Sequence, residues 1–477
     1  MAGVTDLPDP PGGAWDLLVV GGGTAGLVAA RTAAGFGASV LLVERDRTGG
    51  DCLWTGCVPS KALLAAAAAA ADARAAGRLG VRVGSVEVDA GAVLAHVRAA
   101  RTTIEPDDSP ETLEAAGVRV AHGEATFVGP GTVLLDGHRV EARQAVVATG
   151  SAPTVPDLPG LADAVAAGTA LTNETLWDLD DLPGRLVVLG GGSIGCELGQ
   201  AFARLGVRVC LVEAAERLLS REDPDASAAV RTALEADGVD VRTGASATSV
   251  TGDELVLDDG SRLGFDRLLV AVGRTPRTAG LGLGAAGVEL DERGHVRVDD
   301  HLRTSNPRIW AAGDVTGHPA LTHVAGVHGS LVATNAVLGL RRSVDPVVPR
   351  VTFTSPEVGS VGVTTSDGPT VVHTEVDRAV AEGATAGFSR LALDGRGRVV
   401  GATVVGPRAG ETLGELTLAV KQGLRTRDLA GTTHAYPTFS DGAWNAAIAD
   451  VRSRLASPAA VRAVRTLAAL RRRRLGR

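Results

Sequence analysis

The same glycine-rich pattern occurs twice in this chain, each time between two short apolar runs. The first copy places Gly21, Gly23 and Gly26 between an apolar run of strand length and an Ala-rich stretch, and the next apolar run ends at Glu44. Glycines at these positions permit the turn, the approach of a pyrophosphate and close helix packing, while the acid accepts hydrogen bonds from a ribose. The pattern predicts a βαβ dinucleotide-binding unit. A glycine-rich turn without a ligand is the alternative.

The second copy has Gly190, Gly192 and Gly195, and its second apolar run ends at Glu213. Two copies imply two dinucleotides, and one bound tightly beside one that exchanges would form an electron relay from nicotinamide to flavin. The alternative is an old duplication in which one copy no longer binds. A carboxylate at Glu213 suits a ribose 2′-hydroxyl and repels a 2′-phosphate, so NADH is favoured over NADPH.

Further turns follow other strand-like runs, where ligands of open α/β sheets bind. The residues of these turns are Ala148, Thr149, Gly150, Gly273, Gly313 and Asp314. We expect them to contribute to the two nucleotide sites. From about residue 346 no glycine pattern occurs, which indicates a third domain without a nucleotide.

Length and charge narrow the class of protein. A chain of 477 residues predicts about three domains. The net charge is −8, but residues 452–477 hold nine Arg and no acid, which leaves −17 for the rest and argues against nucleic acid as a partner of the body. The start of the chain has no basic stretch, and the longest Ala/Leu run, 62–71, is too short to cross a bilayer, so we expect a cytoplasmic protein without a transmembrane segment.

Four cysteines in so long a chain do not form a structural disulfide framework. Cys52 and Cys57 follow the first glycine pattern closely. Five residues of regular helix advance about 7.5 Å, beyond the roughly 6.8 Å reach of a disulfide, so Gly56 must distort the turn if the pair joins. Beside a flavin such a disulfide takes up two electrons and passes them on, whereas the alternative is two buried thiols. For Cys196 and Cys210 we expect core packing.

The string GGDCLWTGCVPSKAL, the two glycine patterns, GRTP and AAGDVTG together resemble the class I pyridine nucleotide-disulfide oxidoreductases over about residues 15–450. This resemblance implies FAD in the first site, NAD(P)H in the second, and a homodimer formed through the third domain. It also implies electron flow from NAD(P)H through FAD to the disulfide, which then reduces a small-molecule acceptor. No resident metal site is predicted.

The resemblance assigns roles to several residues. Cys57 would face the flavin, and Cys52 would meet the substrate. Gly50 would contact the cofactor, and Lys61 would lie near the flavin, paired with Glu197. Lys61 is one of only two lysines beside 45 arginines. A surface lysine is the alternative.

The fold class we expect is α/β, with two Rossmann-like nucleotide-binding domains, for FAD and NAD, and a C-terminal α+β dimerisation domain. The FAD-binding domain would comprise residues 1–162 and 285–345, with the NAD(P)-binding domain, 163–284, between its two parts. The dimerisation domain would span 346–451, followed by an Arg-rich tail, 452–477. The tail has a helical pattern broken at a proline. We favour a solvated or disordered end over contact with anionic lipid or an acidic partner.

The expected active-site base is replaced. In the disulfide-reducing members of the family, the matching segment carries a His before Pro-Thr and a Glu five residues later; here Tyr436 and Asp441 stand at these positions. Tyr titrates near pH 10 and His near 6.5, so Tyr436 is a poor base at neutral pH. It can still donate a hydrogen bond to a thiolate or approach a soft metal. His434 lies two residues earlier, and we expect it to face solvent.

The sequence therefore predicts an FAD-dependent NAD(P)H oxidoreductase that reduces a small disulfide or a comparable soft electrophile through Cys52 and Cys57. A metal or quinone reductase of the mercuric reductase type is an alternative, although that branch carries a C-terminal cysteine pair and residues 442–477 contain no cysteine. A dihydrolipoyl dehydrogenase with an altered base is another. A lipoyl-complex subunit or redox sensor is the alternative outside catalysis.

Overall fold

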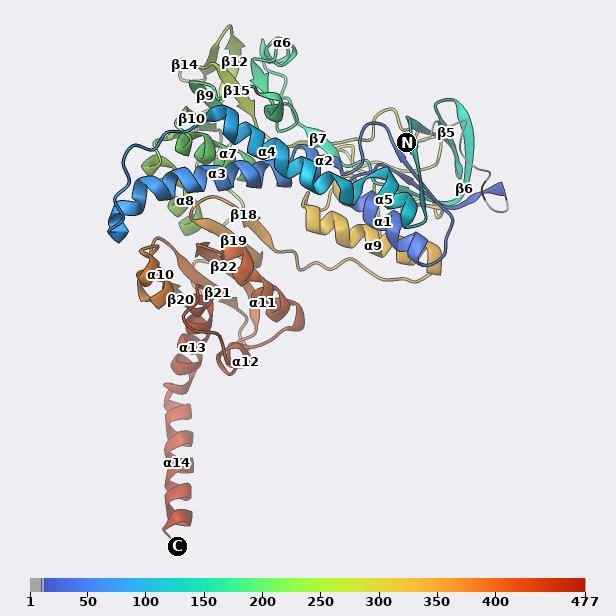
Figure 1. Cartoon of the computed structure of the whole chain (residues 1–477). Coiled ribbons are helices and arrows are strands. Elements are labelled where there is room, and N and C mark those ends of the chain that lie inside the picture. The colour runs from blue at the N-terminus through green and yellow to red at the C-terminus, as the bar shows by residue number, and fades with distance from the viewer. Residues whose placement is uncertain (1–9, 11–12, 477) are drawn as a thin grey trace.

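The computed structural model describes Pro10 and residues 13–476 of the chain. The start of the first predicted domain and the last arginine of the tail lie outside the described residues. The described part contains two sheets with parallel strands, each with covering helices, and a third, antiparallel sheet below them (Figure 1). The predicted α/β class with a separate C-terminal domain is confirmed.

The first sheet carries the first glycine turn. Its strand order is β3-β2-β1-β6-β5-β4, with β17 also paired to β6. Its strands are β1 (Trp15–Val20), β2 (Val40–Glu44), β3 (Val118–His122), β4 (Ala125–Gly129), β5 (Thr132–Leu135), β6 (His138–Val147) and β17 (Ile309–Ala311). The strands β3, β2, β1, β6 and β17 are parallel, whereas β4, β5 and β6 form an antiparallel meander.

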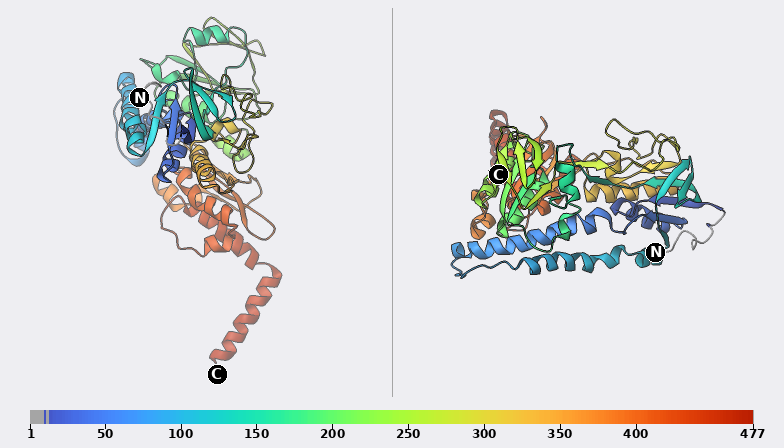
Figure 2. Two further views of the ribbon diagram at one scale, coloured as in Figure 1. Left: turned by 90° about the vertical axis from the view of Figure 1, so that its right-hand side faces the viewer. Right: turned by 90° about the horizontal axis from the view of Figure 1, so that it is seen from above.

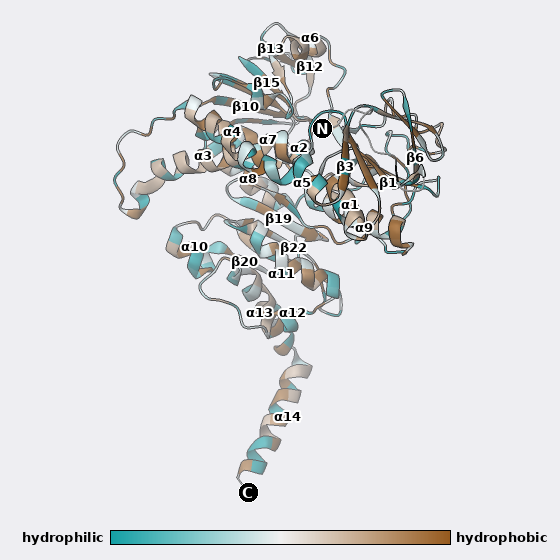
Figure 3. Cartoon of the chain, turned by 45° about the vertical axis from the view of Figure 1, so that its right-hand side comes forward, coloured by the Kyte–Doolittle hydropathy of each residue, from teal (hydrophilic) through white to brown (hydrophobic). Residues whose placement is uncertain are grey.

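Apolar runs make the strands of this sheet, because parallel strands are covered on both faces. Five of the six residues of β1 are buried, and the sheet is coloured mainly as hydrophobic in Figure 3. One face packs against α1 (Thr24–Gly35) and α9 (Thr322–Leu338), which contact each other along their lengths. The short helix α5 (Pro110–Ala115) packs near β3. Because β1 and β17 both run parallel to β6, their C-terminal ends lie at the same edge of the sheet.

The second sheet carries the second turn and is wholly parallel, with the order β11-β10-β9-β15-β8. Its strands are β8 (Ala170–Leu171), β9 (Arg185–Leu189), β10 (Arg208–Glu213), β11 (Asp240–Thr243) and β15 (Arg267–Val270). The helices around it are α6 (Leu161–Ala166), α7 (Ser193–Arg204) and α8 (Pro224–Ala236). A small antiparallel sheet is added by β12 (Ala247–Thr251), β13 (Glu254–Leu257) and β14 (Arg262–Gly264).

The C-terminal sheet is antiparallel, in the order β18-β19-β22-β21-β20. Its strands are β18 (Arg350–Thr352), β19 (Glu357–Gly362), β20 (Thr370–Val372), β21 (Phe388–Leu393) and β22 (Val399–Gly406). The helices of this region are α10 (Asp377–Glu382), α11 (Ala409–Gln422), α12 (Thr426–Ala430), α13 (Asp441–Leu455) and α14 (Pro458–Leu475). The last helix, α14, extends away from the body (Figure 1).

Two helices after the first βαβ unit connect the regions. The short α2 (Gly50–Trp54) precedes α3 (Cys57–Ala75), which runs beside α4 (Ala90–Ile104), as the view from above shows (Figure 2), and also packs on α7. The pair β7 (Ser151–Pro153) and β16 (Arg274–Pro276) joins the two nucleotide sheets. Single turns of 3-10 helix are η3 (Ala76–Leu79), η4 (Glu105–Asp108), η5 (Leu176–Asp178), η6 (Gly313–Thr316) and η7 (His373–Glu375).

One expectation about this helical stretch needs correction. The run Gly50–Leu79 is long and apolar enough to cross a membrane by length and composition, because the helix extends well beyond the Ala/Leu run itself. A third of the apolar window is buried, and α3 packs on α4 and α7, as the core helix of a folded domain does. The run is therefore weak evidence for a membrane span.

Candidate active site

The first glycine turn connects β1 to α1. Gly21 has a φ of 108°, a conformation that favours glycine. The backbone N–H of Gly22 donates to Glu44 Oε2 at 2.6 Å, and Asp46 N–H donates to Glu44 Oε1 at 2.9 Å. The Glu44 carboxylate thus ties the turn to the end of β2. Each of its oxygens keeps a lone pair for a ribose hydroxyl.

The second turn, between β9 and α7, repeats this geometry. Gly190 has a φ of 115°. Gly191 N–H donates to Glu213 Oε2 at 2.6 Å, and Ala215 N–H donates to Glu213 Oε1 at 2.7 Å. The two copies are therefore structural repeats, down to the hydrogen bonds of the acid.

Both turns fit the pyrophosphate of a dinucleotide. The N-caps of α1 and α7 are Gly23 and Gly192, which have no side-chain cap, so the first backbone N–H groups of each helix remain available to an anion. Gly192 has a φ of −75°, and a Cβ built on it would meet no atom within 4 Å. The packing of the protein itself therefore does not require glycine there, and the open space leaves room for a ligand against the backbone.

The other predicted nucleotide-binding residues lie at the edges of these turns. Ala148 follows β6, and a Cβ on Gly21 would come within 2.5 Å of its carbonyl oxygen. Thr149 Oγ1 donates to the carbonyl oxygen of Arg277 at 2.7 Å. The remaining members of the predicted set also lie in turns, with φ values of 67° at Gly150, 140° at Gly273 and 77° at Gly313.

The helix is broken between the two cysteines, as the spacing requires. Helix α2 ends at Trp54 and α3 begins at Cys57, with Gly56 between them. A Cβ on Gly56 would lie 2.9 Å from the carbonyl oxygen of Asp51, so glycine permits this close return of the chain. Both cysteines are half-buried free thiols. The two thiols are hydrogen-bonded neighbours across this break in the helix.

The two thiols differ in pKa. A hydrogen bond from the Cys52 thiol, together with Thr322 and the charge of Lys61, lowers the pKa of Cys57 to about 6 against the opposing effect of burial. The same hydrogen bond, burial and the Cys57 charge raise the pKa of Cys52. Cys57 Sγ lies 3.1 Å from Thr322 Oγ1, at the first turn of α9. Of the two thiols, Cys57 therefore gives up its proton more readily, and Cys52 donates a hydrogen bond to it.

The structure brings Lys61 and Glu197 together. Lys61 Nζ lies 2.8 Å from Glu197 Oε2, and the side chain of Glu197 is 8% exposed. Phe353 N–H donates to Glu197 Oε1 at 2.9 Å, and Lys61 Nζ lies 4.3 Å from the centre of the Phe353 ring. The acid therefore links α3, α7 and the C-terminal region around one ammonium group.

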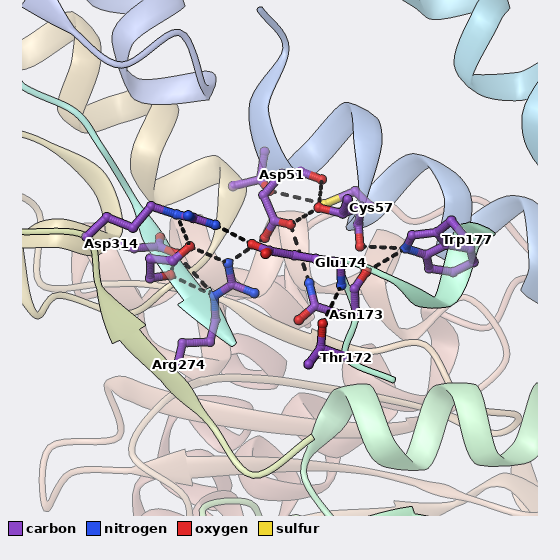
Figure 4. Close-up of polar contacts among 12 residues, drawn as sticks. Asp51, Cys57, Thr172, Asn173, Glu174, Trp177, Arg274 and Asp314 are labelled. Carbon is purple, nitrogen blue, oxygen red and sulfur yellow. Dashed lines mark hydrogen bonds and ion pairs between the residues drawn. The ribbon is translucent and has the colours of Figure 1, made fainter. Parts of the chain in front are cut away.

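Sequence reasoning missed a polar network beside the cysteines (Figure 4). Arg274, which is 16% exposed, lies 2.7 Å from Asp51 Oδ2 and 3.6 Å from Asp314 Oδ2. Ser151 Oγ donates to Asp314 Oδ2 at 2.6 Å and accepts from Arg274 Nε at 2.7 Å. Arg274 therefore connects the acid before Cys52 to the predicted cofactor residue Asp314. The available signal was the arginine inside the GRTP string.

The carbonyl oxygen of Thr55, at the end of α2, also accepts a hydrogen bond. Trp177 Nε1 donates to the carbonyl oxygens of Thr55 at 2.9 Å and Asn173 at 2.7 Å, and Asn173 Nδ2 lies 3.4 Å from Asp51 Oδ1. These contacts fix the loop between the two cysteines. Neither Trp177 nor Asn173 was identified from the sequence, because nothing in the pattern ties residues so distant along the chain to that loop.

The C-terminal candidates lie apart from the cysteine pair of the same chain. The hydroxyl of Tyr436, a residue that is 68% exposed, donates to Asp377 Oδ2 at 2.5 Å. This hydrogen bond and the Asp377 charge raise the pKa of Tyr436. Asp441 is buried and accepts from Thr438 N–H at 3.0 Å. Among the described residues, no hydrogen bond joins Tyr436 or Asp441 to either cysteine or to the other.

One sequence expectation is wrong here. The His434 side chain is only 10% exposed, because it stacks on Trp444 and its Nε2 lies 2.9 Å from Glu415 Oε1. It does not face solvent as expected. The core packing expected for the other two cysteines is confirmed: Cys196 is buried, and Cys210 is half-buried, packed at the edge of the core with its Sγ 3.4 Å from Asp240 Oδ2.

Comparisons with known proteins cover the same elements. The family model described as pyridine nucleotide-disulphide oxidoreductase matches residues 15–329, and that of its dimerisation domain matches residues 348–447. A mercuric reductase of Streptomyces lividans is 41% identical over 451 residues, 90% of this chain and 94% of that protein. A dihydrolipoyl dehydrogenase of Thermus scotoductus is 36% identical over 456 residues, 91% of this chain and 96% of that protein.

A solved structure has the same fold. The Cu(II) complex of the HOCl-induced flavoprotein disulfide reductase RclA from Escherichia coli has a TM-score of 0.82 and 26% identity, covering 91% of this chain and 99% of that one. The likeness therefore extends over both nucleotide sheets and the C-terminal sheet.

Proposed function

Since this chain belongs to the pyridine nucleotide-disulphide oxidoreductases, enzymes that use FAD and NAD(P)H, we propose that it is an NADH-dependent reductase of soft, thiophilic cations. The observation that carries this proposal is a dithiol in which the pKa of Cys57 is lowered to about 6, combined with the absence of an efficient base at Tyr436. The bound flavin supplies the transfer of an electron pair between the nicotinamide and sulfur. The dimerisation domain indicates a homodimer.

The residues of this chain perform the remaining steps. The Cys52 thiol and the Cys57 thiolate join as a disulfide, release the one proton of Cys52, and pass two electrons to one two-electron acceptor or to two one-electron acceptors. Lys61 supports the Cys57 thiolate by its charge. A soft cation binds thiolates directly and requires no base to carry a proton between thiols. The mercuric reductase relative and the Cu(II) complex of RclA support this class of acceptor.

Tyr436 fits the same proposal. A phenol whose pKa is raised by Asp377 remains protonated, so it donates a hydrogen bond rather than removing a proton. In a homodimer with shared active sites, Tyr436 of one protomer would face the cysteine pair of the other. Its oxygen would then stabilise a thiolate or a cation held there.

NADH is the proposed reductant. Both oxygens of Glu213 are held at the second turn, where a 2′-phosphate would meet a carboxylate. The nearby Arg217 is occupied by loop carbonyls, donating to Ser220 at 2.6 Å and Glu222 at 2.9 Å. The reducing cytoplasm is the proposed location, because a cycling dithiol and NADH occur together there.

A second candidate function is reduction of a small disulfide. The His434–Glu415 pair favours it, because it places an imidazole and a carboxylate in the segment that carries Tyr436. His434 would need to leave its stack on Trp444 to reach a thiol. We therefore rank this function below cation reduction.

An acceptor screen with purified holoenzyme tests the proposal. We expect the rate of NADH oxidation with Cu(II) or Hg(II) to exceed the rate with lipoamide, glutathione disulfide or a soluble quinone by about a hundredfold. This factor is the rate that a well-placed general acid–base residue contributes, and Tyr436 does not supply one. Cys52→Ser and Cys57→Ser should each abolish cation reduction, whereas Cys210→Ser, as the matched control, should retain it. Equal or faster turnover with a disulfide contradicts the proposal.

A reciprocal variant tests the role of Tyr436. Tyr436→His should raise lipoamide turnover by about tenfold or more, because an imidazole accepts a proton near neutral pH. The measurement is steady-state kcat with lipoamide, and flavin content serves as the check on folding. If the rate does not rise, the missing base is not what limits disulfide reduction.

A further inference from the structure

The C-terminal helix α14 (Pro458–Leu475) is a separate structural feature that the proposed reaction does not use. It begins after Ser457, whose Oγ accepts from Ala460 N–H at 3.4 Å, and Pro458 occupies the first turn. The sequence expectation of a helical pattern broken at this proline is confirmed, because α13 ends at Leu455. The end is thus an ordered helix of 18 residues and not a disordered tail.

The helix does not pack on the body. No residue of α14 is buried, and it stands clear of the three sheets in Figure 1 and in the left view of Figure 2. Among the described residues, none of its arginines forms an ion pair or side-chain hydrogen bond with the body. A helix of this length is marginally stable alone in water, so a surface that covers one of its faces would stabilise it.

Its side chains are divided between two faces. At 3.6 residues per turn, Val464, Leu467, Ala468 and Leu475 share one face. Leu467 is 66% exposed and Leu475 is 70% exposed. The opposite face carries Arg462, Arg465, Arg472 and Arg473. Arg471 lies on the apolar face itself, between Leu467 and Leu475, and Arg474 lies at its edge; from both positions a long side chain can bend its charge outward. Figure 3 shows this alternation of hydrophobic and hydrophilic colour along α14.

The positive charge of α14 indicates what kind of surface this helix binds. Residues 458–476 hold six arginines and no acid, so this helix carries six positive charges. A second copy of α14 offers the same charges and no acid to offset them, which disfavours pairing of the two helices. A body surface would bring acids at fixed positions, whereas an anionic bilayer accepts arginines in any arrangement and also takes up the apolar face.

We propose that α14 binds the surface of anionic membranes, lying in the interface with Val464, Leu467 and Leu475 inserted and its arginines among the lipid headgroups. The dimerisation domain ends about ten residues before α14, so a homodimer would carry two such helices. Two linked contacts bind more tightly than one. The helix would hold the enzyme on the membrane without spanning it.

Vesicle sedimentation of the full-length holoenzyme tests this inference. We expect binding to phosphatidylcholine vesicles containing about one third phosphatidylglycerol, and none to phosphatidylcholine alone. Changing Arg471, Arg472, Arg473 and Arg474 to Gln should weaken binding at least about tenfold, because each arginine near an anionic surface contributes about fivefold. NADH turnover in solution should not change, since α14 touches none of the active-site residues.

Two further variants separate the contributions. The matched charge control changes four exposed body arginines, Arg82, Arg293, Arg297 and Arg396, to Gln, and should leave vesicle binding unchanged. Val464→Gln with Leu467→Gln keeps every charge and should weaken binding several-fold if the apolar face inserts. Circular dichroism of the variants should show the helix content of the unaltered protein.

Several results would overturn the proposal. These are absence of binding to anionic vesicles, equal loss in the body control, or full binding by the Val464→Gln/Leu467→Gln variant, which would reduce the contact to non-specific charge attraction. A fourth is a change in the oligomeric mass after truncation at Ser457, measured by analytical ultracentrifugation without lipid. That result would assign α14 to contact between protein copies instead.

Discussion

The two glycine turns are nearly identical in their internal bonds but differ in what surrounds them. In each, the acid at the end of the second strand accepts from the turn at 2.6 Å. At the first turn, however, α2 begins beside the helix start, and a Cβ on Gly23 would lie 3.7 Å from Gly50 Cα. At the second turn, nothing lies within 4 Å of a Cβ on the matching residue, Gly192.

This difference indicates different uses of one motif. The first turn lies against the segment that carries Cys52 and Cys57, whereas the second lies against the loop at Leu218, whose Cδ2 would be 2.6 Å from a Cβ on Gly191. We therefore expect a nucleotide that stays bound at the first turn and one that exchanges at the second. Cysteines near the two turns also differ. Hydrogen bonding lowers the pKa of Cys57, which follows the first turn, whereas burial raises the pKa of Cys196, in the helix after the second turn.

The largest effect is expected at the last glycine of each turn, Gly26 and Gly195, because the two positions have the same close backbone contact. A Cβ on Gly26 or Gly195 would lie 1.9 Å from the carbonyl oxygen of Gly21 or Gly190. Gly26→Ala and Gly195→Ala should each lower the free energy of unfolding by about 1–3 kcal/mol, since the chain must move to admit the methyl group. Urea unfolding measures this. Unchanged midpoints in both variants would show that the turns are not packed as described.

The next prediction separates the two turns. Gly192→Ala should raise the KM for NADH about tenfold, because a methyl group there meets the ligand and not the protein, while flavin content and stability stay unchanged. Gly23→Ala, the matched change in the first turn, should lower flavin content and leave the KM for NADH near its original value. Loss of flavin in Gly192→Ala would reverse the assignment of the two sites.

A smaller effect is expected for the acid of the second turn. Glu213→Gln keeps an oxygen for one backbone N–H group and removes the charge that repels a 2′-phosphate. The ratio of kcat/KM for NADH to that for NADPH should fall about fivefold. Glu44→Gln is the control and should leave this ratio unchanged, because the first turn holds the other nucleotide. An unchanged ratio in Glu213→Gln removes the basis for the NADH preference.

The smallest effect concerns Lys61. Its charge is a minor contributor to the low pKa of Cys57, so Lys61→Gln should raise that pKa modestly above about 6. Because the folded pKa is depressed, the thiolate's favourable contacts are present above the ordinary thiol pKa and are lost as pH falls through about 6. The acid limb of the pH profile for cation reduction should therefore move to higher pH. Lys421→Gln should leave it in place, and no movement in Lys61→Gln would exclude the lysine from this role.

Much of the site follows from local rules. The glycine spacing predicted both turns. The glycines and the acid of each βαβ unit lie within about 25 residues of one another along the chain, so a local pattern was sufficient. The six-residue span of Cys52–Cys57 predicted the broken helix, because regular geometry holds its ends too far apart. The Lys61–Glu197 pair came only from the family resemblance, since no local pattern links α3 to α7.

The remaining features depended on contacts between distant segments. Arg274 joins Asp51 to Asp314, and Thr322 reaches Cys57 from 265 residues away, so no spacing rule could indicate either contact. The orientation of His434 was predicted wrongly because burial by Trp444 is a property of the packed domain.

The amino-acid sequence alone determined the α/β class, the two nucleotide turns, the cysteine pair and the replacement of the expected base by Tyr436, because these rest on residue identity and short-range geometry. Only the tertiary structure decided which thiol gives up its proton more readily, which turn lies against the cysteine segment and which helix is left exposed. Proton affinity and accessibility depend on what surrounds a group in space, and folding brings those surroundings from parts of the chain that the sequence keeps apart.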